Sequence, residues 1–329
     1  MEEQLEAIRS SLLYASNTMK SVIFLSLAAL LLVQDPQPPV IGEQHYRIYR
    51  GDGSAATLDH LVAASRAAVV TFLGESHDDP VAHYLEEQIL RRTWDPDAAL
   101  SLEMFERDVQ YVLDEYLAGF ITENHLIASG RAWKNYASDY RPLIEFAKEK
   151  KMPVVAANAP RRYVNRVSRL GVAALAEIEP EGGRFLPPMP YAEASADYAE
   201  KFTRAMEEHR EEGKPPSPRS IALGLEAQSL WDAAMAYSIA DFLTKHPGKR
   251  VLHVNGSFHT AHRLGIVEHL LRYRPNTPLV VVTILPEASF PAFDTKSMYG
   301  AGTFVVVTDP TLPRTYPSES SGPQKNDDK

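Results

Sequence analysis

The chain has 329 residues, of which 44% are hydrophobic and 23% charged, and this composition supports a sizeable core in one large domain or two small ones. The formal net charge of −9 argues against a broad nucleic-acid-binding surface, because phosphate recognition needs a concentrated positive area. The chain has no cysteine, which excludes disulfides, thiolate metal sites, a cysteine nucleophile and a lipid anchor on cysteine.

The N-terminal 33 residues are predicted to be a targeting segment. Lys20 precedes an apolar run over residues 22–33, which has the length of the hydrophobic region of a signal peptide and is short for a bilayer span. We therefore expect export to the periplasm or cell envelope, with residues 1–33 as a signal peptide or an N-terminal anchor and with membrane contact only there. Met19 opens the signal pattern and is an alternative start to Met1.

Short apolar runs alternate with amphipathic segments along the rest of the chain. We predict strands over residues 67–74, 98–105, 152–158, 250–256, 277–285 and 302–308, and helices over residues 80–92, 138–151, 159–171, 191–213 and 220–246. Apolar strands separated by helices indicate an α/β fold with a largely parallel central sheet and helices on both faces.

The predicted domain organisation has one folded domain. We expect a linker and N-terminal segment over residues 34–66, an α/β domain over residues 67–316, and a disordered tail over residues 317–329. A helical insertion at about residues 190–246 is expected to add a helical cap to the sheet.

Acidic and imidazole side chains stand at the ends of three predicted strands. Glu75 and His77 follow the first strand, Glu103 lies near the end of the second, and His259 follows a Gly-Ser turn after the strand over residues 250–256. Because ligands bind outside the carboxyl ends of parallel strands, we expect these four side chains to converge. Such groups bind a divalent metal or act as general acid and base.

Each of these side chains also has a purely structural interpretation, in which it hydrogen-bonds to nearby backbone groups. His83 is expected to pair with Glu87, four residues later, on a solvent-exposed helix face. His253 lies within an apolar strand and is expected to be a hydrogen-bonded core histidine. Two more histidines are expected at the surface of a helix: His262 and His269.

Two other segments carry candidate ligand contacts. Asn158 and Arg161 follow a predicted strand, where an anion could bind. Asp232 shares a helix face with Gln228 and Met235, and a packing face with a buried carboxylate explains this spacing equally well. No Walker A, G-x-G-x-x-G or G-x-S-x-G motif is present, so nucleotide cofactors are not indicated.

Four segments between about Val69 and Pro275 form a distinctive set: LGESHDDPVAH, DYRPLIEFAKEKKMPVVAANAPRRYVNRVSRLG, AQSLWDAAMAYSIADFL and VLHVNGSFHTAHRLG. In this order and spacing they resemble the ChaN family of haem-binding, iron-regulated bacterial proteins. That family belongs with the Tiki-like and erythromycin-esterase-like proteins.

The resemblance implies an exported protein with an α/β fold and a helical addition, and haem binding in which a homodimer encloses the cofactor and a tyrosine ligates iron. The tyrosine in a matching segment is Tyr140, with Tyr84 and Tyr136 as neighbours in sequence. ChaN proteins are often lipoproteins, and the absence of cysteine is a departure from that pattern. The matching positions give a predicted cofactor-binding set: Tyr140, His83, Asn158, Arg161 and Asp232.

Three functions remain open at this point. The first is an exported haem or iron carrier that serves haem or iron uptake. The second is a hydrolase with Glu75, His77 and His259 as catalytic residues, either without metal or with zinc or another divalent ion held by these residues and Glu103. The third is an interaction module in which the polar residues only brace loops.

Overall fold

The structure is a computed structural model, and it describes residues 40–208 and 215–315. The predicted targeting segment, residues 1–33, and the predicted tail, residues 317–329, lie outside the described residues.

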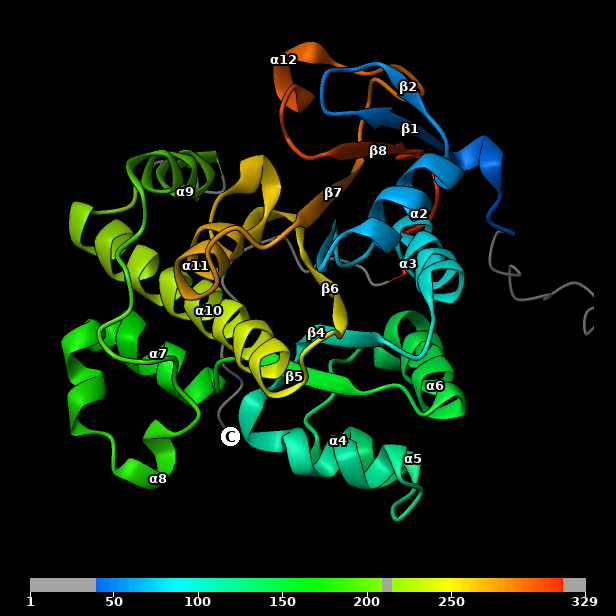
Figure 1. Cartoon of the computed structure of the whole chain (residues 1–329). Helices are drawn as coiled ribbons and strands as arrows, with labels where there is room; N and C mark the ends of the chain where they lie inside the picture. The colour runs from blue at the N-terminus through cyan, green and yellow to red at the C-terminus, as the bar shows by residue number, and fades with distance from the viewer. Residues whose placement is uncertain (1–39, 209–214, 316–329) are drawn as a thin grey trace, which may run out of the picture. The chain divides into compact units, whose positions relative to one another are not determined.

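The centre of the fold is an eight-stranded sheet in the order β2-β1-β8-β7-β3-β6-β4-β5 (Figure 1). Every neighbouring pair from β8 to β5 is parallel, whereas β1 runs antiparallel to β8 and to β2. The predicted largely parallel α/β fold is therefore confirmed. The strands are β1 (Tyr46–Arg50), β2 (Ala55–Ala56), β3 (Val70–Glu75), β4 (Ala98–Glu106), β5 (Val154–Asn158), β6 (Arg250–Gly256), β7 (Leu279–Pro286) and β8 (Phe304–Thr308).

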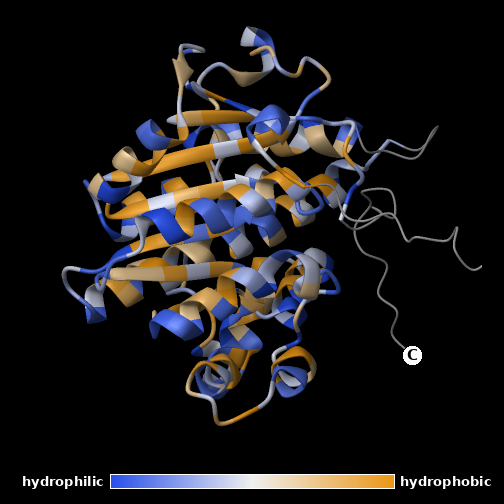
Figure 2. Ribbon diagram, turned by 90° about the vertical axis from the view of Figure 1, so that its right-hand side faces the viewer, coloured by the Kyte–Doolittle hydropathy of each residue, from blue (hydrophilic) through white to orange (hydrophobic). Residues whose placement is uncertain are grey.

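Helices cover both faces of this sheet (Figure 1). On one face lie α2 (Leu58–Ala67), α3 (Pro80–Thr93) and α6 (Arg141–Lys150), and on the other lie α10 (Pro218–Lys245) and α11 (Ile266–Tyr273). Each layer has its own apolar core, and the strands between them are the most hydrophobic part of the fold (Figure 2). Burial on both faces explains why the strands are continuous apolar runs.

The remaining helices complete these two layers or pack around them. Helix α7 (Arg161–Leu170) packs on the outer side of α10 through Val164, Val167 and Leu230, and α9 (Ala196–Glu208) also contacts α10. Before α6, the π-helical turn η3 (Tyr136–Tyr140) buries the side chains of Tyr136, Asp139 and Tyr140. The other helices are α4 (Gln110–Leu117), α5 (Glu123–Ser129), α8 (Pro180–Gly183) and α12 (Thr295–Met298).

The start of α3 is fixed by its cap. Oδ1 of Asp79 accepts a hydrogen bond from the backbone N–H of Val81 at 3.0 Å, and Pro80 supplies the fixed φ angle that suits the first helical position. The other carboxylate oxygen of Asp79 accepts from the hydroxyl of Thr308 at 2.6 Å. The second contact ties the start of α3 to the last residue of β8.

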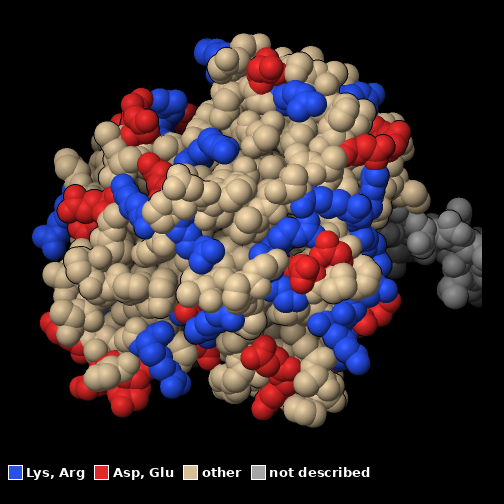
Figure 3. Space-filling view, in the orientation of Figure 1, with Lys and Arg blue, Asp and Glu red and all other residues tan. Residues whose placement is uncertain are grey.

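Among the residues that the structure describes, none of the helices combines the length and the apolar character needed to span a bilayer. On the face shown in Figure 3, acidic and basic side chains are interspersed, as the mixed composition of the chain leads one to expect.

Candidate functional site

The ends of three neighbouring strands form the centre of the candidate site. Strand β6 lies between β3 and β4, and Glu75, the last residue of β3, stands opposite Gly256, the last residue of β6. Oε2 of Glu103, from β4, accepts a hydrogen bond from the backbone N–H of Gly256 at 2.7 Å. The sheet therefore brings the three polar segments to one edge.

The first half of the site surrounds Glu75, whose side chain is fully buried. Oε1 of Glu75 accepts hydrogen bonds from Nδ1 of His77 and from the hydroxyl of Tyr140, both at 2.7 Å. Oε2 of Glu75 lies 3.0 Å from Nδ1 of His83. We call this set the Glu75 group, and its members are Glu75, His77, His83, Glu86, Asp139 and Tyr140.

The structure corrects the prediction for His83. Its side chain is buried rather than exposed, with Nδ1 3.3 Å from Oε2 of Glu86 and Nε2 3.3 Å from Oδ2 of Asp139. Glu87, the predicted partner, instead accepts a hydrogen bond from Arg91 at 2.9 Å. The reason is the direction of α3: the capped first turn faces the end of β3, so positions 83 and 86, three residues apart, both point inward.

The two buried glutamates of this group differ in charge. Burial alone would raise the pKa of Glu75, but His83 and His77 hold that pKa well below its usual value. Burial and the nearby negative charge of Glu75 raise the pKa of Glu86 well above its usual value. The environment thus favours the charged form of Glu75 and the neutral form of Glu86.

The second half of the site surrounds His259, which follows β6 in the short turn η5 (Ser257–His259). Nδ1 of His259 lies 2.6 Å from Oδ1 of Asp232, a fully buried residue of α10, and Nε2 lies 3.6 Å from Oε1 of Glu103. Gln228, one turn before Asp232, also contacts the imidazole at 3.2 Å. We call this set the His259 group, and its members are Glu103, Gln228, Asp232 and His259.

His77 connects the two groups across Gly256. A Cβ atom placed on Gly256 would lie 2.8 Å from Nε2 of His77 and 3.7 Å from Oε2 of Glu103, so glycine is what allows this close approach. The side chain of His77 is 40% exposed, and its ring meets the ring of Trp133 edge to face at 4.9 Å. His77 is therefore the part of the cluster that a ligand in solvent reaches first.

The imidazoles of His77 and His259 are both biased toward the protonated form. Burial opposes protonation of His77, yet its hydrogen bond to Glu75 and the charge of Glu103 raise the pKa of His77 to about 9. Burial also opposes protonation of His259, but Glu103 and Asp232 raise its pKa above the usual value. The buried carboxylates at the strand ends thus favour the protonated form of both imidazoles.

One set of atoms in the described residues has the spacing of a metal site. Ligand atoms of Glu75, His83 and Glu86 lie within 4.8 Å of one another, and all three side chains are buried. The set predicted from sequence contains Glu75, His77, Glu103 and His259, and it stays a prediction. Glu86 is absent from the sequence-based set, and its three-residue spacing from His83 is the signal that could have found it.

The other candidate residues are placed as follows. Asn158 is buried at the end of β5, where its side chain accepts from the backbone N–H of Ala159, and Arg161 is exposed in the first turn of α7. His253 is fully buried and contacts the hydroxyl of Ser101 at 2.9 Å, which confirms the predicted core histidine.

Of the two histidines predicted at the surface, only His262 is exposed, in a 3-10 turn instead of a helix. The prediction for His269 is wrong, because α11 packs its buried side against α10 and encloses His269 beside Tyr191.

Comparison with known proteins adds an independent line of evidence. A family model described as "Haem-binding uptake, Tiki superfamily, ChaN" matches residues 61–270. No curated protein sequence matches the chain significantly.

The chain is similar to several solved structures. The structure of cofacial haem binding to ChaN of Campylobacter jejuni matches with a TM-score of 0.63 and 17% identity, over 82% of this chain and 100% of that chain. The type III effector HopBA1 matches with a TM-score of 0.47 and 10% identity, over 82% of this chain and 99% of that chain. A mutant of the erythromycin esterase EreC matches with a TM-score of 0.42 and 14% identity, over 80% of this chain and 83% of that chain.

Proposed function

Because the chain belongs to the ChaN family of haem-binding uptake proteins in the Tiki superfamily, we propose that it binds haem against the cluster at the ends of β3, β4 and β6. The observation that supports this placement is the part-exposed His77, held by the buried Glu75 and packed edge to face on Trp133. An imidazolium beside an aromatic ring offers a charge for a propionate and an apolar edge for the macrocycle.

The burial of the predicted cofactor-binding residues limits which of them contact haem directly. Tyr140, Asp232, His83 and Asn158 are all buried, whereas Arg161 is exposed. The hydroxyl of Tyr140 already donates to Glu75. We therefore assign Tyr140 a positioning role, in which it shares Oε1 of Glu75 with His77 and so fixes the imidazole that meets the ligand. A role of Tyr140 as iron ligand requires its hydroxyl to leave Glu75.

The cellular role that fits this ligand is haem or iron uptake in the envelope of a bacterium. The apolar run over residues 22–33 supports export, and the family description supports uptake. In this role haem is a transported ligand, and we propose that a homodimer encloses it, as the resemblance to ChaN proteins implies. Cell fractionation tests export: recovery of the protein with cytoplasmic markers contradicts it.

A haemin titration followed by absorbance tests the binding proposal. We expect a saturable Soret shift with the wild-type chain, and a weakening of about tenfold or more for His77→Gln, since a hydrogen bond to a charged group contributes about 1.5–3 kcal/mol. His125→Asn, a change at an exposed histidine of α5, is the matched control and should bind as the wild type does. No saturable shift, or equal affinity for His77→Gln and the wild type, contradicts the proposal.

The Tyr140→Phe variant separates the two roles of this tyrosine. If Tyr140 positions His77, the variant keeps the Soret position of the wild-type complex and loses only affinity. If Tyr140 ligates iron, the spectrum itself changes, because the axial ligand sets the electronic structure of the haem.

The His259 group favours a second candidate function, a hydrolase. An imidazole with a raised pKa, 2.6 Å from Asp232 and 3.6 Å from Glu103, is arranged to hand a proton to a leaving group, and a haem carrier has no need of it. Release of nitrophenol from a nitrophenyl ester tests this function. We expect His259→Asn to lower the rate by about 100-fold or more if His259 is the acid. A rate that equals the uncatalysed rate in buffer excludes ester hydrolysis.

The same preparation tests metal dependence. The spacing of Glu75, His83 and Glu86 fits a divalent ion, which when bound would supply Lewis-acid chemistry or structural support. Elemental analysis of the purified protein, before and after chelation, should then show stoichiometric zinc or another divalent metal that is lost in Glu86→Gln. Metal at trace level in the untreated protein contradicts this assignment.

A further inference from the structure

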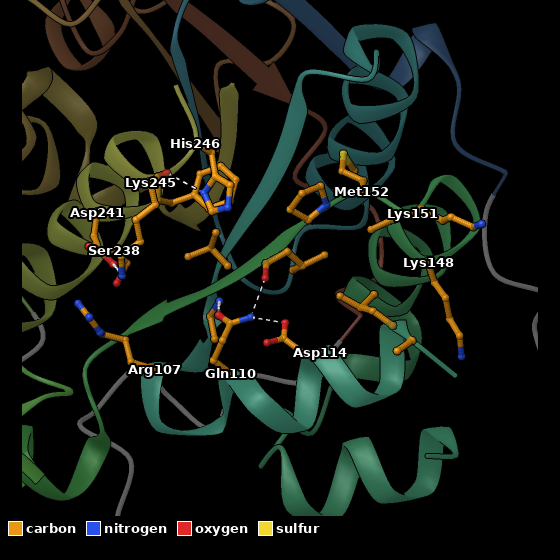
Figure 4. A pocket seen from close by; sticks show the side chains of 18 residues that line it. Arg107, Gln110, Asp114, Lys148, Lys151, Met152, Ser238, Asp241, Lys245 and His246 are labelled. Carbon is orange, nitrogen blue, oxygen red and sulfur yellow. Dashed lines mark hydrogen bonds and ion pairs between the residues drawn. The ribbon is translucent and has the colours of Figure 1, made fainter. Parts of the chain in front are cut away.

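A cavity of about 750 Å³ lies along the free edge of β5, between α4 and the C-terminal half of α10 (Figure 4). Its volume falls within the range of small-molecule sites, about 300–1,000 Å³. No member of the Glu75 group or the His259 group lines it. The cavity is therefore a separate place on the fold from the strand-end cluster.

The backbone at this edge is already satisfied by a side chain. Nε2 of Gln110 donates to the carbonyl of Val154 at 2.8 Å, and Oε1 of Gln110 accepts from the N–H of Ala156 at 2.7 Å. These are the two bonds that a residue of an added parallel strand would make. The edge is thus protected against strand addition, and the cavity is suited to a small molecule rather than to an extended peptide.

The lining of the cavity combines apolar surface with positive charge. Four Lys or Arg residues and two Asp residues line it, which gives a formal charge of +2 in a chain whose own charge is −9. Both aspartates already have partners. Asp114 accepts a hydrogen bond from Gln110 at 2.8 Å, and Asp241 forms an ion pair with Lys245 at 2.7 Å. The apolar part includes Met152, Val155 and Phe242.

Arg107 lines the cavity, and one nitrogen of its guanidinium lacks a hydrogen-bond acceptor. Its Nη1 atom is buried and has no hydrogen-bond partner among the described residues, and no carboxylate in that part of the chain forms an ion pair with it. The guanidinium lies over the ring of Tyr237, 4.9 Å from the ring centre, which fixes its position. Nη1 itself is covered by protein atoms, but Arg107 as a whole is half-buried and lines the cavity, so the accessible part of its guanidinium is what meets a carboxylate there.

We propose that this cavity binds an amphipathic monocarboxylate, with the carboxylate on Arg107 and the apolar body against Met152, Val155 and Phe242. A guanidinium forms paired hydrogen bonds to a carboxylate. One negative charge suits the site better than two, because Asp241 lies close enough to Arg107 to act on it electrostatically. Ser238 adds no free donor, since its hydroxyl donates to the carbonyls of Ala157 and Ala234.

Calorimetric titration of the full chain with decanoate, and with 1-decanol as its uncharged analogue, tests the proposal. We expect saturable binding of decanoate at one site per chain, and binding of decanol that is weaker by about tenfold or more. Arg107→Gln should lose about tenfold or more in decanoate affinity by the same reasoning. Arg219→Gln, at an exposed arginine in the first turn of α10, is the matched control and should bind decanoate normally.

A second variant keeps the test valid if Arg107→Gln fails to fold. Ala118 is exposed and lines the cavity, so Ala118→Trp fills the space from the solvent side without a clash in the core, and it should abolish decanoate binding. Haemin affinity should be the same in Arg107→Gln and the wild type. Equal decanoate affinity in Arg107→Gln and Arg219→Gln, equal affinity for decanoate and decanol, or loss of haemin binding in Arg107→Gln would overturn the proposal of a separate carboxylate site.

Discussion

Two buried glutamates beside His83 provide a matched test of the electrostatics of the site. Glu75 receives three hydrogen-bond or ion-pair contacts, from His77 and Tyr140 at 2.7 Å and from His83 at 3.0 Å. Glu86 contacts His83 at 3.3 Å, and its side chain also hydrogen-bonds to that of Glu75. Glu75→Gln removes a negative charge. Glu86→Gln replaces a neutral acid by a neutral amide.

The expected changes in the free energy of unfolding therefore differ strongly. Glu75→Gln removes the nearest negative charge from His77 and His83, and removal of one partner of a buried ion pair costs about 3–5 kcal/mol. That is a large part of a typical total stability of about 5–15 kcal/mol. At pH 7, Glu86→Gln should be at least as stable as the wild type, since the amide keeps the neutral state without having to take up a proton.

The pH dependence follows from the direction of each pKa shift. The pKa of Glu75 is depressed by folding, so its contribution is present above the usual glutamate pKa and is lost as the pH falls. The pKa of Glu86 is raised, so the contribution of Glu86 to stability falls as the pH rises above about 4.3, by at most about 1.4 kcal/mol per pH unit. Glu86→Gln should lack this loss, and its advantage over the wild type should grow between pH 5 and pH 8.

Urea unfolding at several pH values, followed by circular dichroism and extrapolated linearly, measures these differences. A loss for Glu86→Gln as large as that for Glu75→Gln at pH 7 would refute the assignment of charge to Glu75 alone. If the same samples contained stoichiometric divalent metal, equal losses would show that both carboxylates ligate an ion.

Three further predictions concern the rest of the site. Asp232→Asn removes the carboxylate 2.6 Å from Nδ1 of His259, so the pKa of His259 should fall, as measured by NMR titration, and an unchanged pKa would contradict the pairing of these two side chains. Burial lowers the pKa of His253 to about 3, so the contribution of His253 to stability should decline as the pH falls from about 6.5 towards 3, and in a urea titration this contribution should vanish in His253→Gln. Gly256→Ala places a methyl group 2.8 Å from Nε2 of His77, at the end of a movable side chain, and should weaken haemin binding more than it lowers the urea midpoint; intact haemin affinity would show that His77 does not contact the ligand.

The architecture could be predicted from the sequence because strands that are buried on both faces of a sheet consist mainly of apolar residues. Strands β3 to β8 are continuous apolar runs separated by helical segments, and this pattern alone indicates a parallel sheet. Strands β1 and β2 were not predicted, since a strand of five residues with alternating burial and one of two residues give a weak signal. The position of Glu75 and His77 at a strand end was also predictable, because strand ends are visible in the sequence.

Only the tertiary structure shows which polar side chains face one another. The periodicity of α3 shows that His83 and Glu86 share a face, but not that this face meets Glu75 instead of solvent. Likewise, Asp232 and His259 are 27 positions apart in the chain, and their contact depends on how α10 packs across β6. A local pattern fixes the direction of a side chain relative to its own helix, whereas the charge state of a buried acid depends on every group that packing places around it.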